Sequence, residues 1–491
     1  MPHVILLAKT MSLRVKALKS VPWTATTTIS NVVTRFIVTL AAAHTLDPFD
    51  LGLYAIVNLV LGFAYLIADA GFAQGIISKQ DARPEQLSSL YWASVLFGFA
   101  ICLAVCFLSP LLAMVYGQPR LLGMLLLTAL NFAVAPFGQI FQALLQKNLR
   151  FPVLGRIELL VNVSSALGAI VMLYGGLGVF SLLLSQILAA ALRSLLLRIA
   201  GRTLLQVRMR LSYAEIRHFV HFGMFQIGDR AINYLGSRLD QLLIGSVLGP
   251  AALGYYNMAW MLVVDPVYRI NPIITSVAFP VFAQRQSDAR ALRHGFLVVT
   301  KLLTTANAPL LLGFAAIAPG AVPFLLGAQW MPAVPLVELL SIIAIARTVN
   351  NPVGSLVLAV GRADKSFYWT VVQFAVQVPI YTVLLMRGGL VPATLFLCVV
   401  NWSAVFLVYI YLLRPILGSI FVRYAQAFLP PIGLALGMAV LVRMLSMLTI
   451  ASPSALLIAQ IAFGAIIYCG LTFWLRREDV QELAGLVATR T

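Results

Sequence analysis

Long apolar segments separated by short polar connections run from about residue 21 to residue 474. A membrane-spanning helix needs about 20 predominantly apolar residues. By that measure the pattern predicts about fourteen spans, and the longest connection, about Arg198–His218, leaves no room for a soluble catalytic domain. The predicted spans lie at roughly 21–43, 51–73, 88–108, 121–142, 155–174, 178–197, 219–247, 254–281, 296–318, 334–360, 367–386, 390–412, 427–447 and 455–474.

The composition agrees with a membrane protein. Of the 491 residues, 61% are apolar and 10% are charged, and the mean hydropathy is +0.95. A soluble domain carries about 25% charged residues, so one large globular enzyme is excluded. The four cysteines lie inside apolar runs, and neither a metal-ligand spacing nor a phosphate-binding glycine loop is present. We therefore expect no catalytic residues, no metal and no resident cofactor.

Basic residues decide the orientation of the spans. Lysine and arginine in short loops mark the cytoplasmic side of a membrane protein. Of the 34 basic residues, only Arg120 and Arg387 lie in the loops on one side, eight lie within spans, and the others lie in the N-terminal segment, the loops on the other side and the C-terminal segment. This bias places both termini in the cytoplasm and explains most of the net charge of +18 without a nucleic-acid partner.

The first twenty residues are expected to be a cytoplasmic lead-in. The apolar run Val4–Ala8 is too short for the core of a secretory signal peptide, and no small-residue cleavage site follows it before Lys9. Translation could start at Met1 or at Met11, and the sequence leaves this choice open.

An internal repeat predicts two lobes. The segments Pro48–Tyr54 and Pro250–Tyr256 both read Pro-x-x-Leu-Gly-x-Tyr and open the second and eighth spans. Two parallel halves of six spans, related by an axis along the membrane normal, occur in some transporters. The predicted organisation is a lead-in at 1–20, an N-lobe at 21–197, a linker at 198–218, a C-lobe at 219–412, two further spans within 427–474 and a cytoplasmic tail at 475–491.

Charged residues inside spans point to a function. An ionisable side chain at mid-membrane costs at least about 2.5 kcal/mol, so it should face protein or water. Arg193, Lys301 and Arg443 lie near span ends, and we expect them to extend toward the lipid headgroups. Five other arginines lie too deep for that: Arg35, Arg230, Arg238, Arg269 and Arg347.

Polar stripes accompany these deep arginines. The seventh span divides lengthwise into a polar and an apolar half, which is typical of a helix that faces water on one side. The first, second and eighth spans carry similar stripes, and the stripe of the second span is Tyr54, Asn58, Tyr65 and Asp69. The stripes add Asn31, Asn233, Tyr234 and Gln241 as candidate substrate ligands and Asp69, Asp229, Asp240 and Asp265 as candidate charge-balancing or ion-coupling residues.

These stripes predict a hydrated central cavity between the two lobes, although hydrogen bonds that only hold the bundle together are an alternative. Guanidinium groups pair well with phosphate or carboxylate at low dielectric, so an anionic amphiphile with a phosphate-bearing head fits the cavity. The aspartates either neutralise the arginines or couple transport to H⁺ or Na⁺; Asp265 and Arg269 have ion-pairing spacing, which favours neutralisation.

Three segments resemble a known family: Leu51–Ile77, Ser237–Ala259 and Phe279–Gln284. They are similar to the polysaccharide-exporter branch of the multidrug/oligosaccharidyl-lipid/polysaccharide (MOP) flippase superfamily. The resemblance covers most of the chain and becomes weaker after about residue 420. Arg238 and Asp240 match charged positions of the family's seventh-span block, and Asp69 matches one in its second-span block.

The resemblance implies an all-α, polytopic membrane protein of two six-helix lobes plus two C-terminal helices around a central cavity. Such proteins flip undecaprenyl-pyrophosphate-linked oligosaccharide repeat units across the bacterial inner membrane by alternating access, for exopolysaccharide, capsule or O-antigen assembly. The implied partners are the lipid-linked oligosaccharide, membrane lipids and a polysaccharide polymerase or export machinery. The sugar composition, the oligomeric state and the coupling ion stay open.

Other functions of the same fold are weighed against this one. A multidrug-type cation antiporter would prefer a cavity rich in carboxylates, which five deep arginines disfavour. A peptidoglycan-precursor flippase differs only in its glycan head. A polytopic glycan polymerase or ligase belongs to a different class and commonly needs a sizeable extramembrane loop, whereas every predicted periplasmic loop here is short.

Overall fold

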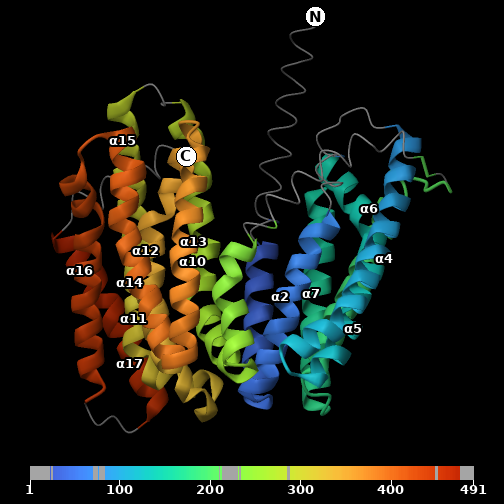
Figure 1. The fold of residues 1–491 in the computed structure, drawn as a ribbon, viewed down its shortest axis with the longest axis horizontal. Helices are drawn as coiled ribbons and strands as arrows, with labels where there is room; N and C mark the ends of the chain where they lie inside the picture. The colour runs from blue at the N-terminus through green and yellow to red at the C-terminus, as the bar shows by residue number, and fades with distance from the viewer. Residues whose placement is uncertain are drawn as a thin grey trace, which may run out of the picture. The chain divides into compact units, whose positions relative to one another are not determined.

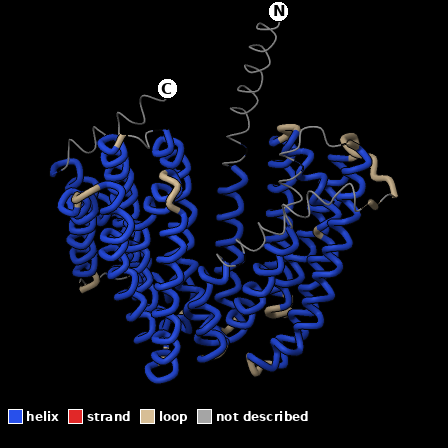
Figure 2. The backbone as a smooth tube through the Cα atoms, turned by 45° about the horizontal axis from the view of Figure 1, so that its top comes forward, coloured by secondary structure: helices blue, strands red, loops and turns tan. Residues whose placement is uncertain are grey.

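The computed structural model describes residues 23, 26–69, 76, 83–209, 211–212, 231, 234–284, 288–447 and 452–475. These residues form helices joined by short turns, and no strand occurs among them (Figure 2). The chain divides into two compact units, Met1–Ala251 and Ala252–Thr491, each with its own packed interior. The predicted lobe, linker and tail boundaries stay predictions.

Ten helices of the described residues are long and apolar enough to cross a membrane, or eleven if the bent pair α5 and α6 counts as one span. Each of them coincides with a predicted span. The predicted first and eighth spans are helical over residues 26–45 and 250–284 but fall outside that count, and the seventh is described only at residue 231 and over 234–247. The all-helical membrane fold is therefore confirmed, and the total of fourteen spans stays a prediction.

The first unit is a bundle in which α8 contacts α5, α6 and α7, while α2 and α4 pack on α5 (Figure 1). Proline occupies the first turn of α4, α5, α6 and α7, where its missing N–H costs nothing and its fixed φ favours helix initiation. The unit contains α2 (Pro48–Asp69), α4 (Pro84–Val115), α5 (Pro119–Val134), α6 (Pro136–Lys147), α7 (Phe151–Tyr174), α8 (Phe180–Gly201) and helical residues 26–45 and 234–247.

A sharp bend of 45° at Pro136 separates α5 from α6. Proline cannot donate the hydrogen bond that would continue the helix, so the carbonyl four residues earlier loses its usual donor. The hydroxyl of Ser194 on α8 contacts the backbone at the bend, donating to the carbonyls of Val134 at 3.1 Å and Ala135 at 3.4 Å. A Cβ on Gly138 would lie 2.7 Å from the Cα of Ser194, so only glycine lets α6 approach α8 this closely.

The second unit is built around α11, which contacts α12, α16 and α17, while α14 packs on α12 and α13 on α14. Gly389, with φ of +79°, makes the tight turn between α13 and α14. The helices are α10 (Pro250–Gln284), α11 (Ala289–Leu326), η1 (Ala328–Ala333), α12 (Val334–Ala359), α13 (Ala363–Gly388), α14 (Leu390–Val408), the π-helical η2 (Tyr409–Leu413), α15 (Arg414–Leu417), α16 (Phe421–Leu445) and α17 (Pro453–Leu475).

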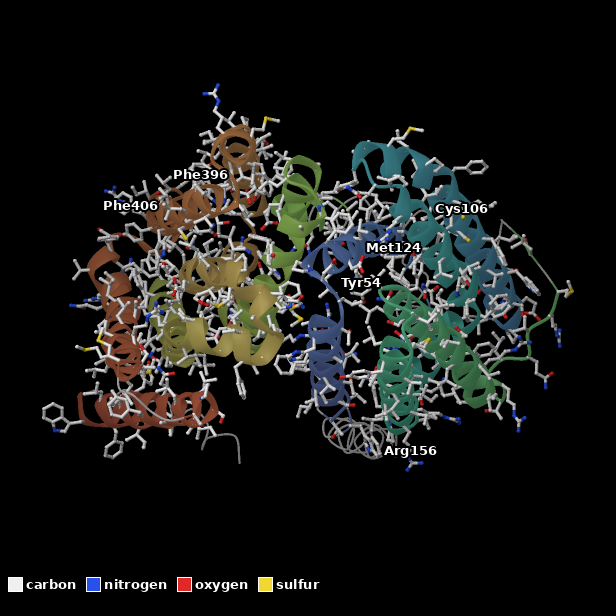
Figure 3. The ribbon with its side chains drawn as sticks, turned by 90° about the horizontal axis from the view of Figure 1, so that it is seen from below. Tyr54, Cys106, Met124, Arg156, Phe396 and Phe406 are labelled. Carbon is white, nitrogen blue, oxygen red and sulfur yellow. The ribbon has the colours of Figure 1, made fainter. Side chains whose placement is uncertain are left out.

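Many large apolar side chains point out of the bundles. Within Asp364–Gly388, only 11% of the most apolar 18-residue stretch is buried inside the protein. On the adjacent α14, Phe406 is 51% exposed; Figure 3 labels it together with Phe396 of the same helix. Apolar surface on this scale is stable only against a non-aqueous solvent, which supports the assignment of these helices to a membrane.

Candidate functional site

Arg347 of α12 is the best-positioned of the predicted deep arginines. Its Nη1 donates to the hydroxyl of Tyr268 on α10 at 3.2 Å, and its Nε donates to Oδ1 of Asn401 on α14 at 3.3 Å. The guanidinium carbon lies 4.9 Å from the ring centroid of Trp260. Partners from two other helices thus fix a planar cation in one orientation.

The aromatic support under Arg347 is itself layered. The indole of Trp260 is 3% exposed and stacks on the half-exposed ring of Tyr268, with centroids 6.4 Å apart and planes 23° apart. Tyr256, which is fully buried, lies against the same indole at 6.0 Å. The Tyr268 hydroxyl, the Asn401 amide and the indole carry no net charge, and together they fix the plane of the Arg347 guanidinium.

Amide side chains gather in the same unit. Nδ2 of Asn401 donates to the carbonyl of Leu397 at 2.8 Å, which leaves its oxygen to accept from Arg347. On α11, Asn307 donates to Oδ1 of Asn271 on α10 at 2.9 Å, and both residues are buried. Buried amides of this kind are stable only when most of their polar atoms are paired. They give the second unit a polar interior along α10, α11 and α12.

In the first unit, the predicted stripe of the second span is partly confirmed. Tyr54 and Asn58 of α2 share one face, because Nε2 of Gln186 on α8 donates to the hydroxyl of Tyr54 at 2.6 Å and to Oδ1 of Asn58 at 3.4 Å. Figure 3 labels Tyr54 on α2. Tyr65, two turns further along α2, lines a pocket against α8. The side chain of Asp69 lies outside the described residues.

Arg193, which lines that pocket, forms an ion pair. Nη2 of Arg193 on α8 lies 2.7 Å from Oε2 of Glu158 on α7. Their side chains are 37% and 26% exposed. A carboxylate at this distance holds the guanidinium in place and cancels its charge within the bundle.

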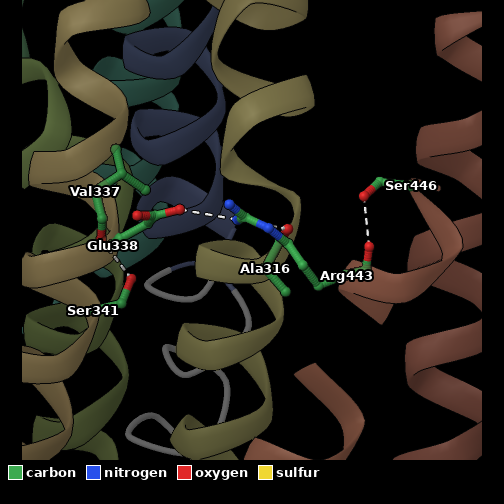
Figure 4. Close-up of polar contacts among 6 residues, drawn as sticks. All are labelled: Ala316, Val337, Glu338, Ser341, Arg443 and Ser446. Carbon is green, nitrogen blue, oxygen red and sulfur yellow. Dashed lines mark hydrogen bonds and ion pairs between the residues drawn. The ribbon is translucent and has the colours of Figure 1, made fainter. Parts of the chain in front are cut away.

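The expectation that Arg193 and Arg443 extend toward the headgroups stays a prediction, and the structure adds that each has a carboxylate partner on another helix. Arg193 pairs with Glu158, and Nη1 of Arg443 on α16 lies 2.9 Å from Oε1 of Glu338 on α12 (Figure 4). The same nitrogen also donates to the carbonyl of Ala316 on α11 at 3.4 Å. Arg443 therefore connects three helices of the second unit. The same expectation for Lys301 stays a prediction.

The predicted residues of the seventh span have partners within the first unit. Nη1 of Arg238 donates to Oε1 of Gln241 at 3.2 Å, and Oδ1 of the buried Asp240 accepts from the backbone N–H of Gln241 at 2.9 Å. The hydroxyl of Tyr234 donates to the carbonyl of Leu59 on α2 at 3.0 Å. The Tyr234 contact joins the helix at 234–247 to α2, whereas the other two lie within that helix. Their substrate roles stay predictions.

The other predicted residues show no such partners. Asn31 and Arg35 are exposed on the helix at 26–45, and their side chains form no hydrogen bond or ion pair with the described part of the chain. Asp265 and Arg269 on α10 are half-buried and form no ion pair with each other or with other described residues, so the ion pair that their spacing suggested is not formed. Asp229, Arg230 and Asn233 lie outside the described residues.

Sequence reasoning missed Glu158 and Gln186 and the pocket that Arg193 lines. A usable signal existed for Glu158, because it and Arg193 lie at similar distances from the short connection between two consecutive spans. Antiparallel neighbours joined by a short loop bring such positions to the same depth. No local signal links Gln186 to α2. Among the described residues, no three His, Cys, Asp or Glu side chains are grouped as a metal site would need.

Comparison with known proteins adds sequence evidence. A family model described as "Polysaccharide biosynthesis protein" matches residues 42–335. The lipopolysaccharide biosynthesis protein WzxC of Escherichia coli strain K12 is 31% identical over 426 residues, which is 87% of each chain. The teichuronic acid biosynthesis protein TuaB of Bacillus subtilis strain 168 is 36% identical over 307 residues, which cover 62% of this chain and 64%, less than two thirds, of TuaB.

Solved structures identify the fold. The chain is similar to the lipid II flippase MurJ in an inward closed conformation, with a TM-score of 0.72, 13% identity, and coverage of 94% of this chain and 100% of that chain. It is also similar to an inward-facing multidrug resistance MATE family transporter of the MOP superfamily, with a TM-score of 0.60, 14% identity, and coverage of 79% and 94%. At these identities, the likeness establishes the fold and nothing more.

Proposed function

The chain belongs to the family of polysaccharide biosynthesis proteins, and on this basis we propose that it flips undecaprenyl-pyrophosphate-linked oligosaccharide repeat units across the bacterial inner membrane. The transported lipid would supply exopolysaccharide, capsule or O-antigen assembly. Transport would proceed by alternating access, and the protein would act as a transporter and not as an enzyme. The relatives' names and the fold support this class of function.

The setting of Arg347 is the observation that carries the proposal. A guanidinium inside an apolar bundle costs free energy of insertion, so such residues are rare and commonly functional. Three groups, from Tyr268, Asn401 and Trp260, contact the guanidinium and orient its plane. A guanidinium held in one orientation suits a pyrophosphate, which accepts two parallel hydrogen bonds. Arg347 would therefore receive the head of the lipid carrier.

The finer architecture belongs to the same proposal. We infer fourteen spans arranged as two six-helix lobes plus two C-terminal helices around a central cavity, with both termini in the cytoplasm. The distribution of basic residues supports this orientation. Arg35, Arg230, Arg238 and Arg269 would add to the cationic lining of the cavity. A polysaccharide polymerase or export machinery would take over the flipped unit.

Ion coupling is proposed only in outline. Asp69, Asp229, Asp240 and Asp265 are carboxylates in or near spans, where titration or Na⁺ binding couples transport in other pumps. Asp240 is buried on the same helical segment as Arg238. Its negative charge would compensate the arginines while the cavity is empty. Binding of H⁺ or Na⁺ to the carboxylate would remove that compensation during the cycle.

Deletion of the gene tests the proposal. Lipid-linked repeat units should then accumulate on the cytoplasmic face, and surface polysaccharide should fall at least about tenfold. Mass spectrometry identifies the accumulated polyprenyl lipids. A periplasmic glycan-modifying enzyme reports which leaflet holds them. Lipid-linked units that reach the periplasm at the normal rate in the deletion strain would overturn the proposal.

The same analysis separates the alternatives. Accumulation of a lipid with a peptidoglycan-precursor head would assign the protein to that pathway, and a change confined to drug sensitivity would indicate an antiporter. Complementation with wild type and with Arg156→Ala provides the control, and both should restore export. Arg156 is an exposed arginine of α7 that also lies over a tryptophan ring, at 5.5 Å from the ring centroid of Trp23, and Figure 3 labels it.

A further inference from the structure

A small pocket lies within the first unit, at the bend between α5 and α6. Its volume is about 290 Å³, and α2, α5, α6 and α8 contribute its walls. The size is at the lower end of the range for ligand pockets and suits one sugar ring better than an oligosaccharide.

The bend that forms the pocket is fixed from two sides. On α4, a Cβ at Gly98 would lie 2.5 Å from the carbonyl oxygen of Phe132 and 2.3 Å from Cγ of Pro136, so α4 packs directly on the bend. On the other side, Ser194 donates to the carbonyls of Val134 and Ala135. The walls are therefore formed before any ligand arrives, which lowers the cost of binding.

The lining combines an aromatic face with planar hydrogen-bonding groups. The ring of Tyr65 is 42% exposed and tilts against Phe132, with centroids 4.8 Å apart. Gln142 of α6 also lines the pocket, and its amide forms no hydrogen bond with the described part of the chain. This amide has hydrogen-bonding capacity to offer a ligand.

The electrostatics of the pocket disfavour an anion. Glu158 lies 2.7 Å from the guanidinium of Arg193 and cancels its charge, so a phosphate would meet a carboxylate as well as a cation. A neutral ligand with many hydroxyl groups avoids that repulsion. Its hydroxyls can accept from Arg193 and exchange hydrogen bonds with Gln142, while its apolar C–H face lies on Tyr65.

We propose that this pocket of the first unit is a subsite for a single neutral sugar ring. The proposal rests on the proposed function in one respect: the ring is taken to be part of the glycan that the protein carries. The pocket would then select among glycans, while the pyrophosphate is held elsewhere by arginine.

The test uses the full-length protein in lipid nanodiscs and ligand-detected saturation-transfer NMR. The probes are the methyl glycosides of glucose, galactose and mannose, with methyl glucuronide and inorganic pyrophosphate as anionic probes. At least one neutral glycoside should show transfer with wild type. Gln142→Ala should raise its apparent Kd roughly tenfold, as expected for one lost hydrogen bond, and Tyr65→Ala should do the same through loss of the ring.

Gln146→Ala is the matched control, because Gln146 lies one turn further along α6 and does not line the pocket. It should bind like wild type, and thermal unfolding should confirm that all variants are folded. The proposal is overturned if no neutral glycoside shows transfer, if only the anionic probes compete, or if Gln142→Ala and Tyr65→Ala bind like Gln146→Ala.

The subsite and the flippase can fail separately. If the glycosides do not bind but deletion of the gene still traps lipid-linked glycan in the cytoplasmic leaflet, the subsite is wrong and the flippase proposal stands. If the glycosides bind but the deletion strain still delivers its lipid-linked units to the periplasm normally, the flippase proposal is wrong. The assignment of the pocket as a sugar-binding site then stands.

Discussion

Two arginines, Arg193 in the first compact unit and Arg347 in the second, each lie between helices, and different kinds of partner hold them. In the first unit, the carboxylate of Glu158 lies 2.7 Å from Arg193. In the second, Arg347 contacts a hydroxyl, an amide oxygen and an indole face. The difference teaches that the same side chain can be positioned in two ways, either by the charge of a carboxylate or by hydrogen bonds and a ring face that fix its plane.

A second contrast concerns proline. The sequence Pro136-x-Gly138 recurs as Pro352-x-Gly354 within the fourth and tenth predicted spans. In the first unit the chain bends by 45° at the proline, whereas α12 of the second unit continues through it as one helix. In the first unit, a hydroxyl from α8 donates to carbonyls at the bend, and a glycine packs directly against α8. A local sequence permits a bend, and the neighbouring helix determines whether the bend forms.

The largest expected effect comes from Arg347→Ala. Removal of an arginine that pairs with a pyrophosphate costs about 2 kcal/mol or more, which corresponds to at least a roughly 30-fold slower export. Arg347→Lys keeps the charge without the planar guanidinium, so its export rate should lie between those of wild type and Arg347→Ala. Initial rates of glycan delivery, at matched protein levels, measure this. Normal export by Arg347→Ala would remove the proposed contrast between the two arginines.

The glycines that follow the two prolines provide a matched pair. Gly138→Ala would place a Cβ 2.7 Å from the backbone of Ser194 and should destabilise the protein by about 1–3 kcal/mol. Gly354 is exposed with open space around it, so Gly354→Ala should be neutral or stabilising by up to about 1 kcal/mol. Thermal unfolding of the purified variants measures both. Equal shifts would show that the bend is not held by this close approach.

Glu158→Ala tests charge compensation in the first unit. It leaves Arg193 unpaired and should lower stability by about 1–2 kcal/mol, less than for a fully buried pair because both side chains are partly exposed. Adding Arg193→Ala to this variant should recover part of the loss, since no unpaired charge then remains. Thermal unfolding of both single variants and the double variant gives the coupling energy, and a coupling near zero would contradict a functional ion pair.

The smallest effect is expected for Ser194→Ala. It removes the donor to the carbonyls of Val134 and Ala135 and should cost about 1 kcal/mol. Thr348→Val on α12 is the comparison, because the hydroxyl of Thr348 bonds only within its own helix, to the carbonyl of Ala344 at 2.8 Å. Its loss should be smaller, as measured by thermal unfolding. A greater loss for Thr348→Val would reverse the inferred roles of the two hydroxyls.

Much of the fold could be predicted from apolar length and period alone. Ten predicted spans coincide with helices suited to a membrane. The reason is that a run of about 20 apolar residues has the length that a helix needs to cross the hydrocarbon core of a bilayer. The stripe of Tyr54 and Asn58 was equally readable, since residues four apart lie on one helix face. Arg347 could be singled out from the sequence, because its charge lies far from either end of an apolar run, and its substrate role stays a prediction.

The sequence by itself therefore determined the helices, the family and which charges need an explanation. Only the tertiary structure decided their partners: Arg193 reaches Glu158 across 35 residues, and Arg347 reaches Asn401 across 54 and Tyr268 across 79. The physical reason is that helical periodicity relates residues within a turn or two, whereas the pairing of side chains on different helices depends on how those helices pack and rotate against one another.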